Sequence, residues 1–131
     1  MAIWTSVNPM SSSNLGSVAM PIDGKYDNLP VTTLPGGVER RIIHTDHLMM
    51  ANVLFTDGPT KEPDPFHSHP HEQVAFVAEG EIFLFFGDGE PIKLKGGDHF
   101  AIPSGVPHTI QRLTQTVRII DCFTPLRNDF L

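Results

Sequence analysis

Short apolar runs, separated by turn residues, follow one another along most of this chain. No segment of helical length shows apolar residues at spacings of three and four. The 11 glycines and 12 prolines suit short strands joined by tight turns. The pattern predicts strands at 38–43, 48–55, 73–77, 81–86, 91–94, 100–102 and 116–124. Runs 81–86 and 91–94 flank Gly87-Asp88-Gly89-Glu90, which indicates a hairpin. The chain is therefore predicted to be all-β.

The first 35 residues are predicted to be an extension that precedes a barrel formed by residues 36–131. Residues 21–35 are rich in turn residues. Residues 1–20 allow two interpretations. They form either a mobile tail or a strand that pairs with a partner subunit, which would explain an exposed Trp4.

Composition limits the possible partners and locations. A chain of 131 residues with 40% hydrophobic residues is long enough for one domain with a sizeable core. The net charge of −6 and the lack of a basic cluster argue against nucleic acid as a partner. No stretch reaches transmembrane length, and no basic region precedes an apolar run at the N-terminus. We therefore expect a cytoplasmic protein that does not bind membranes.

Three imidazoles and a carboxamide form the first chemical signal. Strand side chains alternate between faces, so His67 and His69 share one face, and Gln73 shares a face with Ala75 and Val77. His108 follows the tight corner 103–107. Imidazole nitrogens with an oxygen donor suit one divalent transition metal, and spacing does not choose among Zn, Ni, Fe, Mn and Co. Gln73 is either a ligand through its carbonyl oxygen or a hydrogen-bonding group beside the ligands.

The other histidines and the single cysteine are given structural interpretations. His44 and His47 lie in a polar turn and should be solvated, while His99 should be structural. Pro70 interrupts the alternation before His71, which we place near the mouth of the barrel and not among the ligands. Cys122 allows no intramolecular disulfide, and with no base or cation beside it we expect it to serve packing.

The two histidine segments each form a longer motif. The first reads H-x-H-x-x-x-Q-x-x-x-x-x-x-G, with His67, His69, Gln73 and Gly80. The second reads G-x-x-x-x-x-P-x-G-x-x-H, with Gly97, Pro103, Gly105 and His108. Together they resemble the two motifs of the cupin superfamily over residues 36–127. The resemblance implies a double-stranded β-helix, or jelly-roll barrel, whose metal takes ligands from both motifs. This chain departs from the usual pattern at Gln73, where cupins carry Glu.

Asp121 is the unusual residue of the last strand, because it shares a face with Ile119 and Phe123. A carboxylate inside a barrel is costly unless it is paired or has a task. Arg127, six residues on, could provide the positive charge. The alternative is a structural salt bridge between Asp121 and an arginine at a sheet edge.

The His-Ser-His-Pro-His-Glu-Gln segment and the D-x-F-x-x-x-R ending resemble one group of small cupins. That group takes part in pectin degradation and linearises 4,5-unsaturated uronates. The resemblance implies metal ligation by His67, His69, Gln73 and His108. It also implies roles in activity for Asp121, Phe123 and Arg127, a small-molecule substrate and a homodimer. An iron-dependent dioxygenase and a non-enzymatic binder of sugars or other small molecules remain alternatives, so the sequence leaves open whether the protein is an enzyme.

Overall fold

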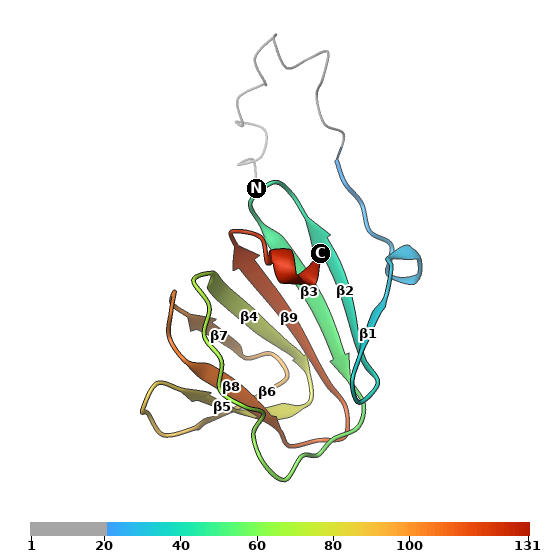
Figure 1. The fold of residues 1–131 in the computed structure, drawn as a ribbon. Coiled ribbons are helices and arrows are strands. Elements are labelled where there is room, and N and C mark those ends of the chain that lie inside the picture. Colours follow the sequence, from blue (N-terminus) through green and yellow to red (C-terminus); the bar gives the residue numbers. More distant parts are fainter. Residues whose placement is uncertain (1–20) are drawn as a thin grey trace, which may run out of the picture.

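Two antiparallel sheets form the fold in a computed structural model that describes residues 21–131 (Figure 1). The six-stranded sheet has the order β1-β2-β3-β9-β4-β7, and the three-stranded sheet has the order β6-β5-β8. The strands are β1 Thr32–Leu34, β2 Val38–His44, β3 Met49–Phe55, β4 Glu72–Glu79, β5 Glu81–Phe86, β6 Ile92–Lys95, β7 His99–Ile102, β8 His108–Arg112 and β9 Val117–Thr124. Two 3-10 turns, η2 Tyr26–Asn28 and η3 Asn128–Phe130, complete it. The predicted all-β class and double-stranded β-helix are confirmed.

The predicted strands all appear, and the predicted hairpin is the β5–β6 pair, in which Glu81 lies opposite Lys95. Two strands were missed, β1 and β8. β1 lies in the stretch expected to be turn-rich, where it pairs with β2 so that Thr32 faces Arg40. Its three residues are largely exposed and bury no alternating apolar face, so periodicity could not reveal it. The proposed pairing of Trp4 with a partner subunit lies outside the described residues.

Buried and exposed side chains alternate along β4, which shows which face of this strand points into the barrel. Gln73, Ala75 and Val77 are buried, whereas the residues between them are exposed. β4 is flanked by β9 and β7, so both of its edges are paired. Val77 packs in a buried cluster with Ile82 and Val117, all three with no exposed surface. Burying each such side chain contributes about 1.5–3 kcal/mol, so this cluster fixes which face of β4 carries Gln73 inward.

Gly80 shows why the first motif ends on a glycine. It connects β4 and β5 with a φ of +87°, in the left-handed region that side chains disfavour. A Cβ at this position would lie 2.2 Å from the carbonyl oxygen of Thr116. The turn therefore packs directly against the segment that leads into β9, and only glycine leaves room for this approach.

None of the helices formed by residues 21–131 is long and apolar enough to cross a membrane.

Candidate metal centre

Backbone pairing brings two of the candidate ligands together from distant parts of the chain. The amide of His67 donates to the carbonyl of His108 at 3.1 Å, and the amide of His108 donates back at 2.9 Å. Residues directly opposite in an antiparallel bridge project side chains to the same face. The two imidazole centroids are accordingly 4.3 Å apart.

His69 completes a cluster of three histidines. The carbonyl of His69 accepts a 2.9 Å hydrogen bond from the amide of Gly105, which continues the pairing of the two motif segments. The imidazole centroid of His69 lies 4.9 Å from that of His108. Ligand atoms of His67, His69 and His108 all lie within 4.8 Å of one another, a spacing that one metal ion could bridge.

Hydrogen bonds from the Nδ1 atoms of His69 and His108 fix which ring nitrogen of each imidazole carries the proton. Nδ1 of His69 donates to the carbonyl of His71 at 3.0 Å, and Nδ1 of His108 donates to the carbonyl of Val106 at 2.9 Å. Each Nε2 therefore carries a lone pair, and that of His108 is buried without a hydrogen-bond partner among residues 21–131. Burial also lowers the pKa of both imidazoles, which favours the neutral form. Such a donor set fits a divalent metal.

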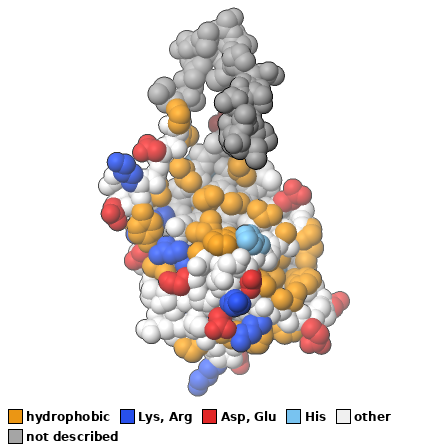
Figure 2. All heavy atoms as spheres, turned by 180° about the vertical axis from the view of Figure 1, so that it is seen from behind, with side chains coloured by type: hydrophobic (Ala, Val, Ile, Leu, Met, Phe, Trp, Pro, Cys, Tyr) orange, Lys and Arg blue, Asp and Glu red, His pale blue; other side chains and the backbone are white. Residues whose placement is uncertain are grey.

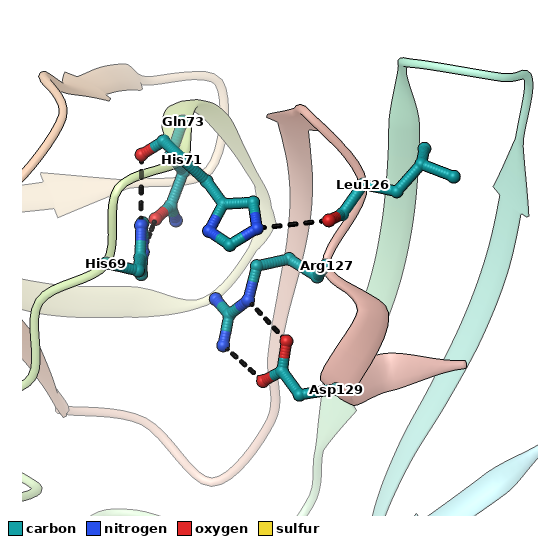
Figure 3. A network of polar contacts seen from close by, with 6 residues as sticks. All are labelled: His69, His71, Gln73, Leu126, Arg127 and Asp129. Carbon is teal, nitrogen blue, oxygen red and sulfur yellow. Dashed lines mark hydrogen bonds and ion pairs between the residues drawn. The ribbon is translucent and has the colours of Figure 1, made fainter.

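Gln73 lies beside this cluster, buried on β4 (Figure 3). Its Oε1 is 3.2 Å from Nε2 of His69, and its Nε2 donates to Oδ1 of Asp121 at 2.8 Å. Because His69 donates through Nδ1, its Nε2 and the Gln73 oxygen are both electron-pair donors. Their close approach fits two neighbouring ligands of one cation.

Asp121 is not the sheet-edge ion pair that the sequence allowed. β9 lies between β3 and β4, and Asp121 faces Ala51 on one side and Ala75 on the other. Its hydrogen-bond partner is Gln73. Burial raises the pKa of Asp121 to about 6, although the Gln73 hydrogen bond and the charge of Arg127 act in the opposite direction. A carboxylate with this pKa can hold or release a proton near neutrality.

Arg127 pairs with Asp129 and not with Asp121. Its Nε donates to Oδ1 of Asp129 at 3.0 Å and its Nη2 donates to Oδ2 at 2.7 Å. The guanidinium also lies over the rings of Phe130 at 4.3 Å and Phe123 at 5.1 Å. Sequence reasoning missed Asp129, because the irregular ending after Thr124 gives no periodicity from which to predict side-chain direction.

One cavity of about 380 Å³ collects most of these groups. Its lining includes the predicted residues His67, Gln73, His108, Asp121, Phe123 and Arg127. Most of the remaining wall is aromatic or aliphatic, including Phe55, Phe100 and Ile119, and Asp64 and Thr109 also line it. Polar and charged groups that converge in an apolar cavity are typical of small-molecule sites.

The remaining histidines and Cys122 lie outside the cavity lining. His44 and His47 are exposed, and the exposed His99 packs on the ring of Phe76 at 4.8 Å. His71 is half-buried outside the ligand cluster, and its Nε2 donates to the carbonyl of Leu126 at 3.0 Å. Burial raises the pKa of the Cys122 thiol, which does not favour a nucleophilic thiolate.

Comparison with known proteins identifies relatives of this chain. Residues 53–123 match the family model described as a cupin domain. The pectin degradation protein KdgF of Dickeya dadantii is 36% identical over 107 residues, covering 80% of this chain and 94% of the relative. The bovine 3-hydroxyanthranilate 3,4-dioxygenase is 30% identical over 77 residues, which cover 56% of this chain and 27% of the relative.

Solved structures give the same picture. KdgF from Halomonas sp. superposes with a TM-score of 0.72 at 30% identity, covering 82% of this chain and 97% of that one. An RmlC-like cupin from Shewanella frigidimarina superposes with a TM-score of 0.72 at 29% identity, with coverage of 82% and 94%. The chain therefore belongs to the cupin family and is a homologue of the pectin degradation protein KdgF.

Proposed function

We propose that this protein is a metal-dependent enzyme that linearises 4,5-unsaturated uronates, a ring opening without redox change. The observation that carries the proposal is one cavity lined by histidines of the three-histidine cluster, the carboxylate of Asp121 and the guanidinium of Arg127. The chain is similar to the pectin degradation protein KdgF over 94% of the length of that relative, and this similarity supports the substrate class.

The reaction is an isomerisation. The anomeric hydroxyl loses its proton, the bond between C1 and the ring oxygen breaks, and C1 becomes an aldehyde. The electron pair of the broken bond stays on the ring oxygen, which becomes the enolate oxygen attached to C5. C4 then takes up a proton, and C5 becomes a ketone. One proton leaves and one arrives, so the enzyme needs a group that can do both.

Four residues would hold the metal: His67, His69, Gln73 and His108. A divalent metal bound there would act as a Lewis acid toward the substrate oxygens. Gln73 is neutral, so a metal in this set would keep its full charge, unlike one bound by the usual Glu.

The other three predicted residues act on the substrate directly. Asp121 takes the proton of the anomeric hydroxyl and returns one to C4, for which a pKa of about 6 is suitable. Arg127 binds the substrate carboxylate. Phe123, which is 3% exposed, forms an apolar wall against the sugar ring.

The direct test uses purified protein loaded with each of Zn, Ni, Fe, Mn and Co in turn. It is given unsaturated galacturonate released by a pectate lyase, and loss of the ultraviolet absorbance of the C4–C5 double bond is followed. We expect at least one metal form to exceed the spontaneous rate, with no oxygen consumed. Oxygen uptake that matches turnover would instead indicate a dioxygenase, and saturable binding without turnover would indicate a non-enzymatic binder.

We also propose a cytoplasmic homodimer. Figure 2 shows hydrophobic side chains gathered over the face opposite to that seen in Figure 1. An apolar groove is lined by residues of β3, β9, β4 and β7, among them the exposed Met50, Val74 and Phe76. Exposed apolar patches of this kind favour association. Light scattering after gel filtration tests the dimer, and a monomer at micromolar concentration would contradict it.

A further inference from the structure

Asp129 occupies only one edge of the Arg127 guanidinium. The Nε and Nη2 atoms of Arg127 each donate to a different oxygen of Asp129, at 3.0 and 2.7 Å. A guanidinium has five N–H groups in one plane, and this side-on pair uses two of them. The two N–H groups of Nη1 and the second N–H group of Nη2 remain.

The remaining N–H groups of Arg127 can donate hydrogen bonds to a ligand in the cavity. Nη1 has no hydrogen-bond partner in the described part of the chain. Figure 3 shows this end of Arg127 turned away from Asp129, toward the side on which His69 and His71 lie. Arg127 lines the cavity and Asp129 does not, so Asp129 stands behind the guanidinium. One N–H of Nη1 and one of Nη2 are parallel at this end, which matches the two oxygens of a carboxylate.

Contacts at the main chain before Arg127 and at its guanidinium limit how the side chain can move. The main chain just before it is held by the hydrogen bond from His71 to the carbonyl of Leu126, at 3.0 Å. The guanidinium packs over Phe130 and Phe123. The Arg127 side chain is 14% exposed, whereas that of Asp129 is 59% exposed. The carboxylate of Asp129 therefore lies in water, where its charge is screened and repels a second anion only weakly.

We propose that Asp129 is a positioning residue, which holds Arg127 side-on so that the opposite end of the guanidinium binds the carboxylate of a uronate. The site thereby selects uronates over neutral sugars. The substrate class in this inference rests on the proposed function. Without Asp129, Arg127 regains rotational freedom, and that entropy must be lost again when a ligand binds.

The test is a double-mutant cycle in the metal-loaded protein. Asp129→Asn is made in the wild type and in an Arg127→Ala background. Glu39→Gln is the matched control, because Glu39 forms a 3.2 Å ion pair with Arg41 on β2 and neither residue lines the cavity. We expect Asp129→Asn to raise the KM for unsaturated galacturonate about tenfold and to change kcat less than about twofold. In the Arg127→Ala background it should change KM less than about twofold. A role in folding alone would not produce this dependence on Arg127.

Equilibrium binding separates this inference from the proposed function. Titration of galacturonate and of galactose into the metal-loaded proteins needs no turnover, so it remains decisive if the wild type fails to open unsaturated uronates. We expect Asp129→Asn to weaken galacturonate binding about tenfold, to leave galactose binding unchanged, and to have no effect once Arg127 is Ala. Four results would each overturn the inference: no binding of galacturonate, equal affinity for both sugars, no effect of Asp129→Asn, or the same effect in both backgrounds.

Discussion

The carboxamide of Gln73 on β4 donates a 2.8 Å hydrogen bond to the carboxylate of Asp121 on β9. A carboxylate only accepts, so this bond fixes which way the amide is turned and directs Oε1 toward His69. The usual cupin Glu could not donate this bond. Gln73 and Asp121 therefore depend on each other: Asp121 needs a donor at position 73, and Gln supplies one where Glu would not. We call this hydrogen-bonded pair the Gln73–Asp121 arrangement.

Gln73→Glu should separate metal binding from turnover. The new carboxylate is a good ligand, so the metal should be retained. The added carboxylate lies next to Asp121 and disfavours its ionised form, and Asp121 loses the donor that holds it. We expect kcat for ring opening to fall about tenfold or more. Gln111→Glu is the control, because Gln111 lies on β8, donates to the carbonyl of Thr60 and is not part of the cavity lining. An unchanged kcat in Gln73→Glu would contradict the arrangement.

Asp121→Asn should remove proton transfer while leaving the metal in place. Asn has nearly the same volume, and its oxygen can still accept from Gln73. Loss of a positioned acid–base group lowers rates by about 10²–10⁴-fold, so we expect a kcat in that range below wild type. Elemental analysis should show unchanged metal content. Full activity in this variant would exclude Asp121 as the proton carrier.

His108→Ala should abolish stable metal binding, because it removes a buried imidazole whose Nε2 has no other partner within residues 21–131. We expect metal affinity, measured by competition with a chelator, to weaken about 100-fold or more. His99→Ala is the control, since His99 is exposed and packs on Phe76. Equal metal affinity in the two variants would show that the three-histidine cluster is not the metal site.

Gly80→Ala should destabilise the barrel by about 2 kcal/mol or more in urea unfolding. The substitution combines an unfavourable positive φ with a clash against the Thr116 carbonyl. Gly37→Ala isolates the first effect, because Gly37 has a φ of +75° and a Cβ added there would meet no atom within 4 Å. A loss in Gly80→Ala no greater than that in Gly37→Ala would show that the close approach is unimportant.

Asp57→Asn should lower the Tm by a few degrees at pH 7 and have little effect in acid. The hydrogen bond from the buried Arg112 and its charge hold the pKa of Asp57 below its usual value. The ion pair therefore stabilises the fold above the unfolded pKa of about 3.9, and this stabilisation is lost as pH falls through the lower folded pKa. Thermal melts of both proteins from pH 7 to pH 2 should converge. The exposed Glu90→Gln variant is the control, and a Tm difference independent of pH would contradict the prediction.

Much of the ligand arrangement could be predicted from local pattern. Gln73 lies on one face with Ala75 and Val77 because of the two-residue repeat of strand β4, and the same alternation in the extended segment before it brings His67 and His69 together. The motif glycines mark turns with positive φ, as at Gly80. Such features depend on neighbours within a few residues, so the sequence alone specifies them. The tautomers of His69 and His108 could not be predicted, because they depend on carbonyls that folding brings near each ring.

The sequence by itself determined the all-β class, the faces of the strands and the residue types offered to a metal. Only the tertiary structure decided that Asp121 bonds to Gln73 and that Arg127 turns to Asp129. The first pairing joins residues 48 positions apart, through the placement of β4 beside β9. The second arises in the irregular ending around η3, where no repeat fixes side-chain direction. The physical reason is the same in both cases: packing of the whole barrel selects one partner among several that local pattern permits.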